Sequence, residues 1–139
     1  MATCSAETEG NSQTLIDSPG IPWNQWPKKK KKIAGIYVIK QDGLVIYVGR
    51  SKDIEQRLKS HCYGKVQAID EHIADTAPKW LSYNYVIDPD QKCNEHCYID
   101  HITQLQRGQR PEFNRTRGDA CTHCQRRKPG DKDTECAIL

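Results

Sequence analysis

Apolar positions follow a strand-like pattern along residues 33–40 and again along residues 44–49. Both segments are rich in β-branched and aromatic side chains, a composition typical of β-strands. Three residues lie between them, and the last of the three is Gly43. A three-residue hairpin loop favours glycine at its last position, where the backbone is left-handed. The pattern therefore predicts a β-hairpin with a three-residue loop.

The length of this loop decides where two tyrosines lie. With three loop residues, Tyr37 lies directly opposite Tyr47, and directly paired residues share one face of the sheet. A two-residue turn at Asp42 and Gly43 would place the two tyrosines on opposite faces. We expect the three-residue loop and the shared face.

After the hairpin the spacing of apolar residues becomes helical. Ser51 is suited to cap a helix over residues 52–62. The apolar stripe of this helix consists of Ile54, Leu58 and Cys62. Arg57 and His61, one turn apart, are expected at the edge of that stripe.

Three further elements complete the predicted fold. A short helix is expected around residues 66–73, and residues 80–87 predict a third strand. Asp88 and Pro89 open a last helix, which Gly108 terminates. The predicted fold class is α+β, a small three-stranded antiparallel β-sheet flanked by helices in the order β-β-α-(α)-β-α.

The composition fits one folded domain with unfolded flanks. The chain has 139 residues, a usual length for one domain, and 36% of them are hydrophobic, below the roughly 45–50% of average proteins. No apolar run is long enough to span a membrane, and no secretory signal is visible. We therefore expect a reducing compartment, where the seven cysteines favour metal ligands or free thiols over disulfides.

Residues 1–27 show no periodicity and are predicted to form a disordered, acidic N-terminal tail. Their only charged side chains are those of Glu7, Glu9 and Asp17. Trp23 and Trp26 are expected to dock on the domain or on a protein partner, because tryptophan is rarely left in water.

The lysine run at residues 28–32 has three interpretations that stay open. It resembles a nuclear-import signal, which would place the protein in the nucleus, and it equally suits an arm that contacts phosphate or a solvated run. Residues 33–116 form the predicted folded domain, and residues 117–139 form a basic tail that contains cysteines. The basic excess near the C-terminus suits a polyanion such as DNA, although a solubilising surface would show the same balance.

Five motifs occur along the predicted domain in order. They are Gly35-Ile36-Tyr37, then Tyr47-Val48-Gly49, then Arg57 with His61, then Glu95 followed by Tyr98 and Ile99, and finally Arg110-Pro111-Glu112-Phe113-Asn114. Together they resemble the GIY-YIG nuclease superfamily over about residues 33–115. Two features depart from the family pattern, because Val48 replaces isoleucine and the stretch from Glu95 to Asn114 is longer than usual.

The resemblance implies an endonuclease that hydrolyses DNA phosphodiester bonds with Mg²⁺ or Mn²⁺. It implies that Tyr37 is the general base for water, that Tyr47 positions water or phosphate, and that Arg57 clamps the scissile phosphate. His61 would accept or relay the proton. Asn114 would orient the metal's surroundings or the carboxylate that binds it.

Glu95 is the metal ligand that the resemblance implies, and its position on the last helix supports this. It shares a helix face with Tyr98, Ile99 and Ile102, the face expected to pack on the sheet. A carboxylate on that side is costly unless it is paired or binds a metal. One carboxylate without a cluster fits a single Mg²⁺ or Mn²⁺ that keeps several waters. The alternative is a salt bridge from Glu95 to Arg57.

Four cysteines have a spacing that suits a structural zinc ion. Cys93 and Cys97 lie one turn apart on the last helix, and Cys121 and Cys124 form a Cys-x-x-Cys pair in the tail. Alternative ligands are His96, His101 and His123. Free surface thiols or a redox pair are the metal-free interpretations.

The last four residues, Cys136-Ala137-Ile138-Leu139, match a prenylation box whose final leucine favours a geranylgeranyl group. A single lipid without a polybasic segment would attach the chain to a membrane only weakly.

The sequence thus predicts a DNA endonuclease that uses Mg²⁺ or Mn²⁺, with a basic tail that binds phosphate. A nucleic-acid-binding module that keeps the fold but not useful catalysis is the alternative, and a membrane-attached adaptor would depend on Cys136. The preferred DNA structure and the oligomeric state do not follow from the sequence.

Overall fold

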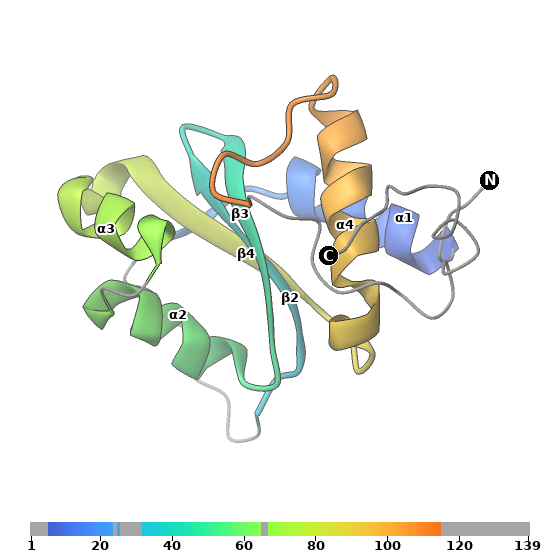
Figure 1. Ribbon diagram of the computed structural model, residues 1–139, viewed down its shortest axis with the longest axis horizontal. Coiled ribbons are helices and arrows are strands. Elements are labelled where there is room, and N and C mark those ends of the chain that lie inside the picture. The colour runs from blue at the N-terminus through green and yellow to red at the C-terminus, as the bar shows by residue number, and fades with distance from the viewer. Residues whose placement is uncertain (1–5, 24, 26–31, 65–66, 115–139) are drawn as a thin grey trace.

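The computed structural model describes residues 6–23, 25, 32–64 and 67–114 (Figure 1). In chain order the elements are α1 (Ala6–Asp17), β1 (Ile21–Pro22), β2 (Gly35–Gln41), β3 (Leu44–Ser51), α2 (Ile54–Tyr63), α3 (Ala68–Asp75), the 3₁₀ turn Pro78–Trp80, β4 (Leu81–Ile87) and α4 (Gln91–Leu105). No helix in these residues is long and apolar enough to cross a membrane.

The strands form one antiparallel sheet in the order β1-β4-β2-β3. The α+β fold class is confirmed, but the sheet has four strands where three were predicted. The additional strand is the two-residue β1, in which Ile21 pairs with Tyr83 and Pro22 pairs with Ser82. Proline is tolerated there because β1 is an edge strand and one side of its backbone needs no ladder partner.

Helices cover both faces of the sheet, with α2 and α3 on one side and α4 on the other, where α1 packs against α4 (Figure 1). Alternate residues of the central strand β2 face opposite layers. Tyr37 and Ile39 belong to the apolar cluster under α2 and α3, whereas Ile36 and Val38 belong to the cluster under α4. Burial of both faces explains why β2 is a nearly continuous apolar run.

The hairpin between β2 and β3 differs from the predicted three-residue loop. Asp42 and Gly43 both have positive φ angles, 54° and 84°, so the connection is a two-residue turn in which Gln41 pairs with Leu44. Asp-Gly is a preferred sequence for such a turn, because aspartate tolerates the left-handed region and glycine has no Cβ. The predicted loop length was therefore wrong.

A β-bulge one residue further on restores the predicted face of the tyrosines. Lys40 pairs with Val45, but the next residue of β2, Ile39, pairs with Tyr47, which leaves Ile46 as the additional residue of β3. One additional residue inverts the alternation of a strand relative to its partner. Tyr37 lies opposite Gly49 in this register, and Tyr47 lies two residues from Gly49 on the same face. The shared face is confirmed, although the two tyrosines are diagonal neighbours.

The N-terminal segment differs from the disordered tail that the sequence predicted, since residues 6–17 form α1 and pack against α4. The buried side of α1 consists mainly of Thr8, Ser12 and Leu15, so it lacks the apolar stripe by which helices are recognised. Lys40 supports the end of this helix, because its Nζ donates to the carbonyl oxygens of Ile16 at 3.3 Å and Ser18 at 2.8 Å.

Trp23 docks on the domain, which is one of the two alternatives that the sequence left open. Its side chain is buried and its ring contacts the ring of Tyr83 edge-on, with centroids 6.2 Å apart. Trp26 and most of the lysine run, residues 28–31, lie outside the described residues. The import signal and the phosphate-contacting arm stay predictions.

Two helix starts lie a few residues later than predicted. Asp53, and not Ser51, caps α2, because its Oδ1 accepts a hydrogen bond from the backbone N–H of Gln56 at 3.3 Å. α4 begins at Gln91, and Asp88 accepts a hydrogen bond from the N–H of Asp90 just before it.

The segment after α4, residues 106–114, covers the open edge of β3. The Gln106 side chain accepts a hydrogen bond from the N–H of Val45 at 2.9 Å and donates one to the Val45 carbonyl oxygen at 3.3 Å. The N–H of Phe113 donates to the carbonyl oxygen of Ile46 at 2.9 Å. Backbone groups that an edge strand would leave unpaired are thus satisfied by residues from beyond α4.

Gly49→Ala should destabilise the protein by about 1–3 kcal/mol, because a Cβ at position 49 would overlap with the ring and Oη of Tyr37 on the neighbouring strand. The measurement is urea unfolding of the variant against wild type. Gly10→Ala is the matched control. A Cβ at position 10 of α1 meets no atom within 4 Å, so this change should raise stability by about 0.5–1 kcal/mol. Equal stability of Gly49→Ala and wild type would contradict the close approach.

Candidate active site

A buried hydrogen bond joins the central strand to α2. The Oη of Tyr37 lies 2.7 Å from Nε2 of His61, and both side chains are completely buried. His61 follows Ile54 and Leu58 at helical spacing, so the packing of α2 on the sheet directs its imidazole toward β2. The sequence placed His61 at the edge of the apolar stripe, whereas the structure places it within the stripe.

The other nitrogen of this imidazole contacts a carboxylate that the sequence analysis missed. Nδ1 of His61 lies 2.6 Å from Oδ1 of Asp70, which comes from the first turn of α3. Tyr37, His61 and Asp70 therefore form one buried hydrogen-bonded chain across three elements. The available signal was the position of Asp70 beside Ile69, on the face by which α3 packs. An acidic residue in a first helical turn has an ordinary explanation as a capping group.

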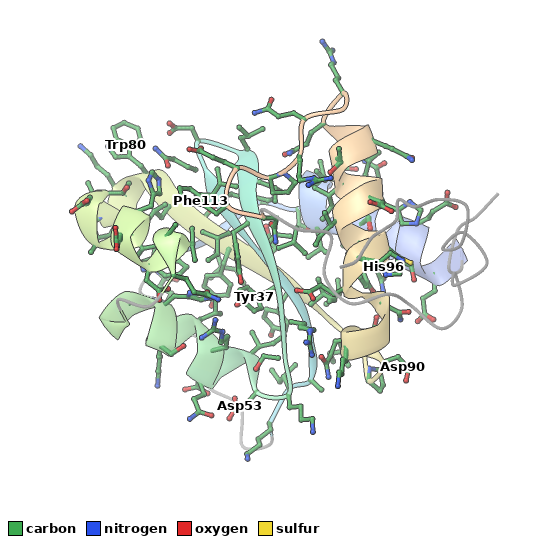
Figure 2. All side chains as sticks on the ribbon, viewed as in Figure 1. Tyr37, Asp53, Trp80, Asp90, His96 and Phe113 are labelled. Atoms are coloured by element: carbon green, nitrogen blue, oxygen red, sulfur yellow. The ribbon has the colours of Figure 1, made fainter. Side chains whose placement is uncertain are left out.

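Tyr47 completes an aromatic group around this chain. Its ring centroid lies 6.1 Å from that of Tyr37 and 5.5 Å from that of His61. Tyr47 is partly exposed, whereas Tyr37 lies between the sheet and α2 (Figure 2). Gly49 leaves the space that the Tyr37 ring occupies. The group therefore has a buried end at Tyr37 and an accessible end at Tyr47.

Burial dominates the protonation of these groups. It raises the pKa of Tyr37 well above the usual value and also raises the pKa of Tyr47, while the positive charge of Arg57 opposes both shifts. Burial lowers the pKa of His61, against the opposing effect of its hydrogen bond to Asp70. Near neutral pH Tyr37 is therefore a phenol and His61 is a neutral imidazole that can accept a proton.

Arg57 lies beside the tyrosines and is held by two neighbours. Its guanidinium donates to Oγ of Ser60 at 3.1 Å and to Oε1 of Gln67 at 3.0 Å. The side chain is only partly buried, so its guanidinium can meet a ligand from solution. The positive charge of Arg57 also offsets part of the increase in pKa that burial causes in both tyrosines.

Glu95 lies near the start of α4, where Tyr98, Ile99 and Ile102 pack on the sheet as predicted. Its Oε1 accepts a hydrogen bond from Nε of Arg50 at 3.2 Å. The salt bridge that the sequence suggested for Glu95 was with Arg57, whereas the observed partner is Arg50. Burial is the main cause of the raised tyrosine pKa values, and the Glu95 charge adds to them. The Glu95 charge therefore acts on both tyrosines.

Glu95 offers a single carboxylate to a divalent cation. In the described part of the chain, no group of three or more His, Cys, Asp or Glu side chains could hold a metal ion. Mg²⁺ is often bound through one or two carboxylates while it keeps several waters. The side chain of Glu95 is 14% exposed, which leaves the carboxylate accessible for such a role. The residues present fit Mg²⁺ or Mn²⁺ held mainly by Glu95 and water.

Asn114 supports the strand that carries Tyr47. Its Oδ1 accepts a hydrogen bond from the N–H of Val48 at 2.7 Å, and its Nδ2 donates to the Val48 carbonyl oxygen at 2.9 Å. The structure thus brings Tyr37, Tyr47 and His61 together, and the charges of Arg57 and Glu95 act on both tyrosines. It places Asn114 on the backbone of β3, where both polar groups of its amide are used.

The predicted zinc ligands are only partly described. Cys97 is buried and disulfide-bonded, and a sulfur in a disulfide is not the thiolate that zinc requires. The Cys93 side chain, Cys121, Cys124 and the prenylation cysteine Cys136 lie outside the described part. The alternative ligands His96 and His101 are buried in α4, and His123 lies outside the described part. The prediction of Cys97 as a zinc ligand is therefore wrong, and so is the expectation of metal ligands or free thiols over disulfides at this position. Zinc binding by the other residues and prenylation stay predictions.

The family is established by comparison of the sequence with family models. The model of the GIY-YIG catalytic domain matches residues 33–104, just over half of the chain. This range contains β2, β3, α2, α3, β4 and nearly all of α4, and with them Tyr37, Tyr47, Arg57, His61 and Glu95. The chain belongs to the GIY-YIG family, whose catalytic domains are nucleases.

Among solved structures, the chain is similar to the GIY-YIG N-terminal endonuclease domain of UvrC from Thermotoga maritima. Three structures of point mutants of that domain, each bound to its catalytic divalent cation, match with TM-scores of 0.40, 0.39 and 0.39. Sequence identities are 17%, 17% and 18%, over 81% of this chain and 99% of the other. No curated protein matches the chain. Likeness at this level adds nothing to the assignment, which rests on the family model.

Tyr37 should remain protonated up to at least pH 10 in the folded protein, because burial raises its pKa well above the usual value of about 10. The measurement is a titration of absorbance at 295 nm for wild type and for Tyr37→Phe, with circular dichroism confirming the fold at each pH. The two curves should coincide up to pH 10. A step at or below pH 10 that is missing only in the variant would show that Tyr37 ionises without help.

Proposed function

We propose that the protein is an endonuclease that hydrolyses phosphodiester bonds of DNA with Mg²⁺ or Mn²⁺. The observation that carries the proposal is the 2.7 Å contact between Tyr37 Oη and His61 Nε2, beside Tyr47, Arg57 and Glu95. Phosphodiester hydrolysis needs an activated water and groups that neutralise developing negative charge. Each need is met by a different side chain of this group.

The proton path follows from the protonation of the buried chain. A buried phenol with a raised pKa is a poor base by itself, because its phenolate is not formed near neutral pH. Tyr37 can accept a proton from water at Oη if it passes its own proton to Nε2 of His61 in the same step. The water oxygen forms the new bond to phosphorus while the P–O bond to the leaving sugar oxygen breaks. The proton from water ends on Tyr37, the Tyr37 proton ends on His61, and the leaving oxygen takes a proton from solvent.

The accessible side of the group suits phosphate binding. Arg57 carries a planar guanidinium that can hold two phosphate oxygens at once, and Ser60 and Gln67 hold it in place. Tyr47, next to it, can position the water or a phosphate oxygen. The hydrogen bonds to Arg57 fix the position of its guanidinium before DNA binds. Less reorganisation of the site is then needed to reach the transition state.

Glu95 would hold the metal ion. When bound there, a divalent cation would neutralise negative charge on the scissile phosphate and on the leaving oxygen. The hydrogen bond from Arg50 orients the Glu95 carboxylate. Selection of a DNA structure, or a protein partner, would then supply the specificity that a small catalytic domain cannot obtain from base contacts alone.

Glu95→Ala should lower the rate of DNA cleavage by about 10³-fold while DNA binding changes little, because the metal loses its carboxylate. The assay is nicking of supercoiled plasmid with Mg²⁺ or Mn²⁺, alongside binding measured at fixed salt. Glu55→Ala is the matched control, since Glu55 lies on α2 in a surface ion pair with Lys59.

Cleavage by wild type and by Glu55→Ala but not by Glu95→Ala would support the proposal. Equal cleavage by all three would contradict the role of Glu95. DNA binding without cleavage by wild type on plasmid and on branched or flapped DNA would instead favour a binding module with this fold.

Arg57→Ala should lower the cleavage rate by about 10²-fold or more, and Arg57→Lys should restore only part of it. Lysine keeps the charge but not the planar fork that meets two oxygens. Rates under saturating DNA, compared with wild type, measure the effect. Full activity of Arg57→Lys would show that charge alone is sufficient at this position.

A further inference from the structure

Both oxygens of Asp70 are engaged inside the protein. Oδ1 lies 2.6 Å from His61 Nδ1, and Oδ2 accepts a hydrogen bond from the N–H of Gln67 at 3.2 Å. The side chain is 4% exposed, and a Cβ at Gly64 would lie 3.0 Å from Oδ2. The carboxylate is therefore enclosed and has one orientation. A burial this costly needs a compensating partner, and His61 provides it.

This geometry fixes which nitrogen of His61 carries the proton. A carboxylate only accepts hydrogen bonds, so Nδ1 of His61 must donate to Asp70. In the neutral imidazole Nε2 then carries the lone pair, and Tyr37, at 2.7 Å, must be the donor. The opposite tautomer would place a proton on Nε2 and leave no acceptor for the Tyr37 proton.

We propose that Asp70 is a positioning residue of the active site, which sets the tautomer of His61 and supports the imidazolium formed when Tyr37 transfers its proton to Nε2. The proposal rests on the proposed function. In the step, the Tyr37 O–H bond breaks and the Nε2–H bond forms, while the Nδ1 proton stays on His61. Asp70 receives no proton and supplies the negative charge that faces the cation.

The charges around His61 explain why this support is needed. The imidazole faces Tyr37 from β2, Tyr47 from β3, Arg57 from its own helix and Asp70 from α3. Arg57 is positive and disfavours a second positive charge on His61, and burial disfavours it further. Among these four groups Asp70 favours the imidazolium both by its charge and by its hydrogen bond.

The same turn of α3 also holds Arg57. Gln67, whose N–H donates to Asp70, accepts a hydrogen bond from the Arg57 guanidinium at 3.0 Å. The first turn of α3 therefore orients the proton acceptor through Asp70 and the phosphate-binding group through Gln67. Supporting contacts of this kind keep catalytic side chains near their productive geometry.

The kinetic test compares Asp70→Asn with wild type in plasmid nicking. The amide of asparagine can donate to Nδ1, which favours the wrong tautomer, so kcat should fall about 100-fold or more with little change in KM. Asp75→Asn, on the exposed side of the same helix, is the matched control and should behave as wild type. A kcat of Asp70→Asn within about threefold of wild type would overturn the proposal.

A double-mutant comparison separates positioning from a general loss of structure. If Asp70 acts through His61, Asp70→Asn should cause no further loss in a protein that already carries His61→Ala. Losses that multiply would show that Asp70 acts elsewhere, and would overturn the proposal.

The activity of wild type should also fall at acidic pH as His61 becomes protonated, with a midpoint below the usual histidine value of about 6.5 because burial lowers the pKa.

A second measurement needs no turnover. Long-range ¹H–¹⁵N NMR of the histidine side chains reports the tautomer of each imidazole, and His61 can be assigned by comparison with His61→Ala. Near pH 7 wild type should show His61 protonated on Nδ1, and Asp70→Asn should shift it toward Nε2. Protonation of wild-type His61 on Nε2 would overturn the proposal. The expected tautomer in a protein that fails to cut DNA would contradict the proposed function alone.

Discussion

The register between β2 and β3 is the constraint on which the active site depends. The left-handed turn at Asp42 and Gly43 would send the two tyrosines to opposite layers, and the additional residue Ile46 reverses this. Tyr37 then lies over Gly49, where any side chain would collide with it. Because α2 packs on the same face, His61 meets Tyr37 there. Turn, bulge and glycine together place one phenol beside one imidazole.

Burying the polar groups of Tyr37, His61 and Asp70 in an apolar layer costs free energy, and the hydrogen bonds between them offset that cost. Tyr37, His61 and Asp70 lie among the apolar residues under α2 and α3, and each buried polar group would be unfavourable without a partner. Their hydrogen bonds at 2.7 and 2.6 Å satisfy the chain from end to end. The same enclosure keeps water away from the imidazole, so a proton that leaves Tyr37 has one acceptor.

The sequence predicted the fold class and named the residues of the candidate site, because these depend on short-range patterns and on motifs. Helical spacing put Arg57 and His61 one turn apart on one side of a helix. The shared face of Tyr37 and Tyr47 was predicted from a loop length that proved wrong, and it holds because a bulge compensates for the shorter turn. The bulge itself could not be predicted from the sequence, because one additional residue within an apolar run leaves no local signal. Arg50 as the partner of Glu95 depends on how α4 lies across β3, which no spacing encodes.

The sequence also could not predict which residues are buried by packing against another helix. Asp70 has the sequence position of a capping residue, and only the packing of α3 against α2 turns it toward His61. The helix α1 presents Thr8 and Ser12 to its neighbours, small polar residues that indicate a surface or a loop when seen alone. In both places the neighbouring helix supplies the information.

The covered edge of β3 bears on how the protein behaves in a crowded solution. An exposed edge strand is a template for pairing with other chains, and sheets with such edges tend to assemble into aggregates. Here the amides of Gln106 and Asn114 bond to the backbone of Val45 and Val48 in the way that a neighbouring strand would, but they offer no further strand for the sheet to grow on. The segment that bonds to the β3 backbone beside Tyr47 therefore also blocks the addition of a further strand at this edge of the sheet.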